Sequence, residues 1–385
     1  MTVAKPIASS IPGKEFGYLK HEKKYSKNEK YVSALSEKID EYSSHVEKLE
    51  SGKEGMKKKG NGDEGLKETL RSCILETKCG VGWDDVVGLS QAKEALHEAV
   101  VLPIRFPSLF QGKRKPWKGI LLYGPPGTGK SFLAKAAATE VSCTFFSVSS
   151  SSLVSKWVGE SERLVRGLFE LAREKRPAII FIDEIDSLCM ERTSNETESA
   201  RRLKTELLIQ MDGVGQDQTG VLVLGATNTP WSLDAGFRRR FEKKIYVGLQ
   251  SAPERTAMMR VHVGAEKHLL TDEDFGYLGD VTEGYSGSDI SNVVRDALMQ
   301  TVRRTGRAMY FKRVVDNGQK CYMPCSPGDD GAVRMKITDI EEDRLVGEPL
   351  QFSDFVRSLR KTKPSVSPGD LQRYEEFTRL FGAED

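Results

Sequence analysis

Long apolar runs are missing from this chain of 385 residues. No stretch approaches the roughly 18 consecutive apolar residues of a membrane-spanning helix, and the first residues, MTVAKPIASSIPGKEFGYLK, contain no apolar core typical of a secretory signal. Cysteine is sparse, with 6 residues spread over the chain and no CxxC pair. We therefore expect a cytoplasmic protein with reduced thiols and no zinc site.

A large excess of one charge is also absent. The chain has 58 basic and 56 acidic side chains, a formal net charge of +2, and 38% hydrophobic residues. This composition is too apolar for a disordered chain and too balanced for a dedicated nucleic-acid-binding protein. We expect no nucleic-acid partner, and a length that corresponds to two or three globular domains.

The first part of the chain differs in pattern from the rest. Apolar residues at three- and four-residue steps predict one amphipathic helix over residues 28–49, within an N-terminal helical arm of residues 1–50. The Gly- and Lys-rich stretch SGKEGMKKKGNGDEG follows. We interpret residues 51–79 as a flexible linker, because this stretch buries too little apolar surface to offset its ordering entropy.

Residues 80–250 predict an α/β domain. Five short apolar runs alternate with helical stretches, and most of these runs lack polar alternation, which favours a parallel sheet covered by helices on both faces. The runs are GILLY at residues 119–123, TFFSV at 144–148, AIIFI at 178–182, VLVLGA at 221–226 and KIYV at 244–247.

Residues 251–385 predict a small helical domain that contains a β-rich insert at about residues 311–346. The insert is rich in Gly, Pro and Asp, whereas the sequence on either side has helical periodicity. The expected helices are residues 253–261, 272–278, 288–304, 352–359 and 369–381.

The strongest motif is GPPGTGKS, which lies between the predicted strand GILLY and the predicted helix FLAKAAATEV. It fits the phosphate-binding pattern G-x-x-x-x-G-K-[ST], in which small residues let backbone N–H groups point at phosphate oxygens. We predict that Lys130 reaches the β- and γ-phosphates and that the Ser131 hydroxyl binds magnesium. The motif residues, all expected to bind nucleotide, are Gly124, Pro125, Pro126, Gly127, Thr128, Gly129, Lys130 and Ser131.

Polar residues that suit phosphoryl transfer follow the later strands. Asp183 is expected to hold the magnesium through water, and Glu184 to polarise the water that attacks the γ-phosphate. Asn228 is expected to orient the same water. The run FRRRF contains three consecutive arginines, and we predict that Arg239 and Arg240 reach the γ-phosphate of a neighbouring subunit as arginine fingers. Ordinary exposure to solvent is the alternative for these arginines.

In this order and spacing, GPPGTGKS, IIFIDE, GATN and FRRRF resemble the AAA ATPase module over about residues 81–385. The segments WDDVVGL, SKWVGE and EGYSGSDI are similar to its meiotic clade, and CSPGDDGA with FTRLFGAED resembles the vacuolar protein sorting-associated protein 4 family. The resemblance implies a P-loop NTPase fold with a large α/β domain, a small helical domain carrying a β-insert, and a C-terminal helix that packs back on the large domain.

The resemblance also implies an activity and a set of partners. It implies a Mg²⁺-dependent ATPase that binds ATP and ADP, forms an ATP-dependent hexamer and disassembles ESCRT-III filaments at endosomal membranes by threading subunits through a central pore. A cofactor protein would bind the β-insert, and membrane association would come through partners only. The end of the arm, HVEKLES, resembles the last helix of a microtubule-interacting-and-transport domain, so the arm is interpreted as a truncated or diverged form of that domain.

Further site residues follow from the resemblance alone. In SKWVGE, the substrate pore loop maps to Lys156, Trp157 and Val158, and a second pore loop maps to residues 196–201. A rigid, amphipathic Trp suits a grip on many peptide sequences. The adenine would lie between two short backbone segments, Asp85-Val86 and Gly287-Ser288.

Two other functions are compatible with these motifs. One is a microtubule-severing ATPase of the same clade, which the β-insert around residues 321–332 disfavours. The other is an assembly scaffold that binds nucleotide without turnover. The presence of Lys130, Asp183 and Glu184 together with both candidate arginine fingers disfavours that second reading.

Overall fold

The computed structural model describes residues 75–76, 80–150, 161–189, 198–213, 220–316 and 318–382. The predicted N-terminal arm, most of the linker and the pore-loop residues Lys156, Trp157 and Val158 lie outside these described ranges. Within them, no helix is long and apolar enough to cross a membrane.

The large domain is built on a six-stranded sheet with the order β1-β3-β4-β5-β2-β6. All pairs except β1 with β3 are parallel, which confirms the predicted fold class. Each of the five parallel strands lies within one residue of its predicted bounds. They are β2 (Gly119–Tyr123), β3 (Thr144–Ser149), β4 (Ala178–Asp183), β5 (Val221–Thr227) and β6 (Lys243–Tyr246).

Strand β1 (Leu75–Glu76) corrects the predicted linker boundary. These two residues pair antiparallel with β3, Leu75 opposite Ser147 and Glu76 opposite Phe146. A two-residue strand at a sheet edge forms through backbone pairing, which leaves no periodic side-chain pattern to recognise. The linker assignment therefore extended too far into the large domain.

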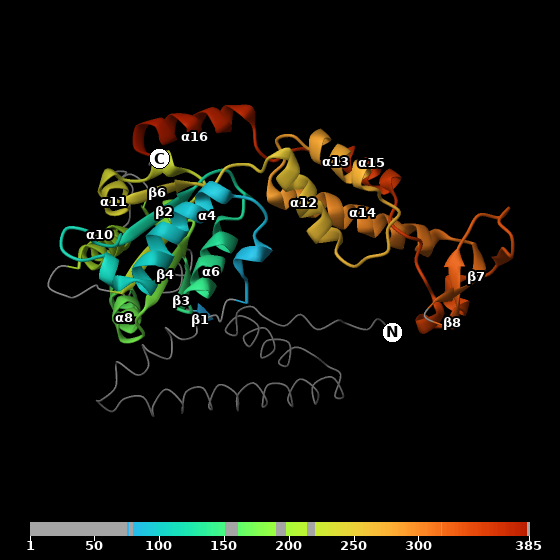
Figure 1. The fold of residues 1–385 in the computed structure, drawn as a ribbon, viewed down its shortest axis with the longest axis horizontal. Coiled ribbons are helices and arrows are strands. Elements are labelled where there is room, and N and C mark those ends of the chain that lie inside the picture. Colours follow the sequence, from blue (N-terminus) through green and yellow to red (C-terminus); the bar gives the residue numbers. More distant parts are fainter. Residues whose placement is uncertain are drawn as a thin grey trace, which may run out of the picture. The chain divides into compact units, whose positions relative to one another are not determined.

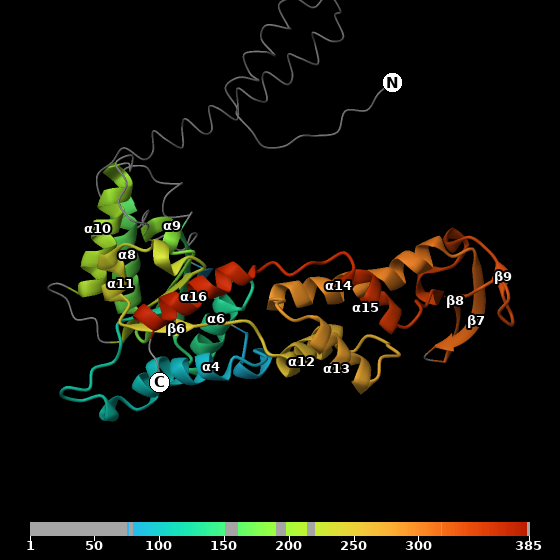
Figure 2. The same ribbon diagram turned by 90° about the horizontal axis from the view of Figure 1, so that it is seen from above.

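Helices cover both faces of this sheet (Figure 2). On one face, α4 (Ser90–Leu96) and α6 (Lys130–Glu140) pack on β2 side chains such as Ile120 and Leu122. On the other face, α8 (Ser161–Glu174) and α10 (Glu198–Asp212) pack on a core that includes Leu121. Because neighbouring side chains of a strand point to opposite faces, an uninterrupted apolar run such as GILLY serves both cores.

The small domain is a helical unit with a β-insert, also as predicted. Its core is formed by α12 (Ala252–Val263), α13 (Asp272–Val281), α14 (Gly287–Arg307) and α15 (Phe352–Leu359). The insert is an antiparallel sheet of β7 (Tyr310–Asp316), β8 (Gln319–Pro324) and β9 (Val333–Arg334), in the order β8-β7-β9. It begins where α14 ends (Figure 1).

The last helix, α16 (Pro368–Phe381), returns to the large domain (Figure 1). Its Tyr374 and Phe377 are buried with Tyr123 of β2, and Trp231 and Tyr246 pack around them. The Tyr123 and Phe377 rings are 5.1 Å apart in an edge-to-face arrangement. Aromatic contacts of this kind stabilise beyond the area they bury.

Short elements complete the described fold. They are the helices α5 (Leu102–Arg105), α9 (Asp186–Cys189) and α11 (Ala235–Arg240), a π-helical turn at His97–Val101, and 3-10 turns at Trp83–Asp85, Pro107–Leu109, Pro230–Ser232, Ile337–Asp339 and Glu342–Arg344.

Candidate active site

The phosphate loop connects β2 to α6 at the carboxyl edge of the parallel sheet. Two of its glycines are required by close contacts. Gly124 has φ +149°, and a Cβ there would lie 2.1 Å from the carbonyl oxygen of Val247. Gly127 has φ +76°, and its Cβ would lie 2.1 Å from the Oγ of Ser288. Only glycine adopts these angles and leaves this space without strain.

Lys130 is the first residue of α6 and is buried. Its Nζ donates to the carbonyl oxygens of Gly124, at 2.9 Å, and Pro125, at 2.7 Å. Burial lowers the pKa of Lys130 to about 8, although the nearby carboxylates of Asp183 and Asp186 act to raise it. An ammonium group in this poorly solvated position gains stabilisation from an anion, as the predicted phosphate contact requires.

Ser131 and Asp183, the two residues predicted to hold magnesium, lie in contact with each other. The Ser131 hydroxyl donates to the Asp183 carboxylate at 2.6 Å. A hydroxyl and a carboxylate are oxygen ligands of the kind that Mg²⁺ takes in nucleotide sites. The residues present therefore fit the expected ion.

Glu184 is held by its backbone while its side chain is exposed. Its φ is +49°, a conformation that costs a non-glycine residue roughly 1–3 kcal/mol. Its N–H donates to Asp183 Oδ1 at 3.0 Å, and its carbonyl accepts from Ser150 Oγ at 3.1 Å. Ser187 supports this arrangement by donating to Ser150 Oγ at 2.6 Å. The strained backbone leaves the carboxylate at the sheet edge, where the predicted general base must be.

Asn228 directly follows β5, the strand next to β4, and is half-buried. The adjacent Thr227 donates from Oγ1 to Asp186 Oδ1 at 2.7 Å. Asp186 is a third carboxylate of this cluster, and it was not among the predicted site residues. The motif IIFIDEID contains it, but only the pairing of β4 with β5 brings it beside Thr227 and within electrostatic reach of Lys130.

The small domain contacts the phosphate loop directly. The N–H of Ser288, at the start of α14, donates to the carbonyl of Gly127 at 3.1 Å. A second contact between the two domains is the hydrogen bond from the Leu89 N–H to the Glu254 carboxylate of α12, at 2.9 Å. The other predicted adenine residues have local roles, since Val86 is buried and Asp85 accepts from the Gly82 N–H at 2.8 Å. The role of Asp85, Val86, Gly287 and Ser288 in adenine binding stays a prediction.

The three arginines of α11 have three different surroundings. Arg238 lies over the Phe381 ring of α16, 5.1 Å from its centroid. Arg240 donates from Nη2 to Asp212 at 2.6 Å, and this hydrogen bond raises its pKa. Arg239 is exposed and has no polar partner within the described ranges.

The position of α11 separates these arginines from the phosphate loop of the same chain. The Arg240 carbonyl lies 2.4 Å from where a Cβ on Gly119 would be, and the next residue but one, Glu242, donates its N–H to the Gly119 carbonyl. Gly119 begins β2, whereas Gly124 follows its end. Five residues of strand span roughly 17 Å. The end of α11 is therefore at the opposite edge of the sheet from its own phosphate loop.

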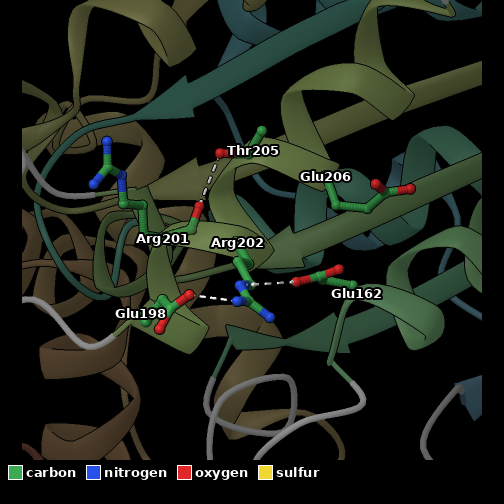
Figure 3. Close-up of a pocket in the computed structure, with 6 residues that line it drawn as sticks. All are labelled: Glu162, Glu198, Arg201, Arg202, Thr205 and Glu206. Carbon is green, nitrogen blue, oxygen red and sulfur yellow. Dashed lines mark hydrogen bonds and ion pairs between the residues drawn. The ribbon is translucent and has the colours of Figure 1, made fainter.

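A charged pocket of about 480 Å³ lies between the start of α8 and the first half of α10 (Figure 3). Arg202 is placed between Glu198 and Glu162, with an ion pair to each. Glu198–Arg201, predicted as part of a second pore loop, form the first turn of α10. The lining residues are Glu162, Glu198, Arg201, Arg202, Thr205 and Glu206.

Comparisons with known proteins agree with this geometry. Residues 120–249 match the model of the ATPase family associated with various cellular activities (AAA), residues 272–315 match the AAA+ lid domain, and residues 322–382 match the Vps4 C terminal oligomerisation domain. Vacuolar protein sorting-associated protein 4B of Mus musculus is 56% identical over 328 residues, which cover 83% of this chain and 74% of the relative. The chain belongs to the vacuolar protein sorting-associated protein 4 family. It is an AAA ATPase.

Two further comparisons place the chain within the wider clade. The katanin p60 ATPase-containing subunit A1 of Arabidopsis thaliana is 45% identical over 329 residues, covering 83% of this chain and 58% of that relative. The crystal structure of the FIGL-1 AAA domain in complex with ADP is 38% identical with a TM-score of 0.69, covering 85% of this chain and 100% of that chain. The vacuolar protein sorting family is thus nearer in sequence than the katanin relative.

Proposed function

We propose that the chain is an ATP-driven protein-remodelling enzyme that assembles into a hexamer and disassembles ESCRT-III filaments in endosomal sorting. The observation that carries the ATPase part is the cluster at the carboxyl edge of the sheet. The phosphate loop follows β2 there, Ser131 of α6 contacts Asp183 at the end of β4, and the exposed Glu184 is the next residue after β4. Family membership carries the cellular role.

The residues divide the work of ATP hydrolysis among them. Lys130 and the loop N–H groups bind the phosphates, and Ser131 and Asp183 hold Mg²⁺, which neutralises phosphate charge when it is bound. Glu184 accepts a proton from the attacking water. Asn228 orients that water from the neighbouring strand. Most of the rate gain comes from this positioning, because phosphoryl transfer needs little covalent help from the protein.

Assembly of the ring brings further positive charge, from arginines, to the γ-phosphate. Arg239 and Arg240 lie too far from the phosphate loop of their own chain, so they act on the γ-phosphate of a neighbouring subunit. Lys156, Trp157 and Val158 grip the threaded substrate in the centre of the ring. The enzyme works in the cytoplasm and reaches endosomal membranes through its partners.

The variant Glu184→Gln tests the ATPase assignment. It keeps the shape of the side chain but removes the base, so we expect ATP binding and ATP-dependent assembly to persist while turnover falls at least about 100-fold. Phosphate release measures turnover, and light scattering measures assembly. Glu140→Gln at the far end of α6 is the matched control and should keep wild-type turnover. Full turnover in Glu184→Gln would refute the assignment of Glu184 as the base.

A second assay tests the substrate. Membrane-bound ESCRT-III filaments should lose subunits when ATP and the enzyme are added, and Glu184→Gln should abolish the release. Polymerised microtubules are the comparison substrate. Severing of microtubules without release of filament subunits would favour the katanin-like alternative, and absence of any phosphate release would favour the scaffold.

A further inference from the structure

Helix α16 holds the segment that begins at Asn228. The Tyr374 hydroxyl, on a side chain that is 3% exposed, donates to the Asn228 carbonyl at 2.5 Å. The Trp231 ring lies 5.1 Å from the Tyr374 ring, and the Arg373 guanidinium lies 4.4 Å from the Trp231 centroid. Helix α16 therefore contacts this segment both at the Asn228 carbonyl and at the Trp231 ring.

The hydrogen bond from Tyr374 acts on one peptide group that is also held from its other side. The Asn228 carbonyl and the Thr229 N–H belong to the same planar unit. That N–H donates to Thr227 Oγ1 at 3.0 Å, and Thr227 in turn donates to Asp186. Both polar groups of the peptide are therefore bonded, and its plane is fixed between α16 and the carboxylate cluster.

We propose that Tyr374 is a positioning residue for ATP hydrolysis, which fixes the peptide after Asn228 and so aims the Asn228 amide at the water activated by Glu184. The inference rests on the proposed function, because the Asn228 amide matters only if a water molecule attacks the γ-phosphate at this site. Tyr374 does not touch the reacting atoms. It acts through Asn228.

Two observations support this role. Burial, with a smaller effect of Asp370, raises the pKa of Tyr374 to about 12, so its hydroxyl stays protonated and remains a donor at neutral pH. The chain just before α16 is also bonded to the start of α14 in the small domain, which contacts the phosphate loop. Ser365, just before α16, donates to Asp289 at 2.8 Å, and Asp289 caps the same helix end whose Ser288 N–H contacts Gly127.

The variant Tyr374→Phe removes only the hydroxyl. We expect kcat for ATP to fall about tenfold, the scale of one lost hydrogen bond to a group whose position sets the rate, with KM changed less than about twofold. Thr378→Val is the matched control. This residue also lies on α16, and its hydroxyl pairs with the Tyr123 hydroxyl of β2 at 2.8 Å. Its loss should lower the melting temperature about as much as Tyr374→Phe does, while kcat stays within about twofold of the wild-type value.

A double-variant cycle separates positioning from general docking of α16. In an Asn228→Ala background, Tyr374→Phe should lower kcat less than about twofold, because the side chain it positions is gone. Equal losses of kcat in Tyr374→Phe and Thr378→Val would overturn the inference, and so would a full tenfold loss in the Asn228→Ala background. A wild-type chain without turnover, or Glu184→Gln with full turnover, would instead overturn the proposed function and this inference with it.

Discussion

Charged side chains gather both around the phosphate loop, at Lys130 and Asp183, and on the arginine helix α11, but their contacts within the chain differ. At the phosphate loop, Lys130, Ser131 and Asp183 all have hydrogen-bond partners within the chain. On α11, Arg239 is exposed and has no polar partner within the described ranges, and the helix ends at the other edge of the sheet.

This difference separates what folding prepares from what assembly must add. The cost of burying Lys130 and of straining the Glu184 backbone is met when the chain folds, so these groups are in place before ATP arrives. Arg239, in contrast, has no polar partner within the described ranges that folding of its own chain would supply. ATP hydrolysis should therefore depend on contact between subunits, whereas ATP binding should not.

The largest expected effect is that of Arg239→Ala. Loss of an arginine finger removes charge stabilisation in the transition state, so kcat should fall about 1,000-fold. Nucleotide affinity should change little, because the phosphate loop of each chain is intact. Phosphate release and nucleotide titration measure the two quantities.

Mixing experiments decide whether Arg239 acts between subunits. Arg239→Ala chains retain Glu184, and Glu184→Gln chains retain Arg239, so mixed rings contain some complete sites. Turnover of the mixture should exceed that of either variant alone. A mixture no more active than its components would show that the two halves of the site are not shared across a subunit boundary.

The next largest effect is that of Lys130→Ala on nucleotide affinity. The Lys130 ammonium is a buried donor at the phosphate loop, and loss of its charge-assisted contacts should weaken binding about 100-fold. In contrast to Arg239→Ala, a site that lacks Lys130 cannot be completed by a neighbour. If mixed rings restored ATP binding to the Lys130→Ala chains, the phosphate loop would not be self-sufficient, and the contrast between the two regions would fail.

The fold and the inner half of the site could be predicted because their signals are local. The apolar runs predicted the parallel strands. The loop from Gly124 to Ser131 fits the phosphate-binding pattern G-x-x-x-x-G-K-[ST], which is specific to nucleotide sites of this kind. The meeting of Ser131 with Asp183 followed from the rule that the carboxyl ends of parallel strands share one edge.

The residues that were missed depend on contacts between distant segments. In the sequence, Asp186 cannot be told from an ordinary surface acid. Its contact with Thr227 at the end of β5 is seen only in the folded chain. Tyr374 fits the apolar face of an amphipathic helix equally well as a core residue, and its bond to the Asn228 carbonyl spans 146 positions of sequence. Side-chain periodicity carries no information about such pairs.

The smallest expected effect concerns Arg240, which has two possible partners. Arg240 is paired with Asp212 within the chain, yet it is also a predicted finger for the neighbouring site. Both side chains are about a third exposed, at 37% and 31%, so solvent screening limits the pair to roughly 1 kcal/mol at most.

Asp212→Asn weakens the hold on Arg240 without removing the arginine. If Arg240 must leave Asp212 to act as a finger, kcat should rise, by no more than about fivefold, because that is the factor corresponding to roughly 1 kcal/mol. The same substitution in an Arg240→Ala background should change nothing, which phosphate release would measure. A fall in kcat would mean that the Asp212 contact holds α11 in place for Arg239. Arg240 would then belong with the groups that folding prepares, and Arg239 alone would face the neighbouring subunit.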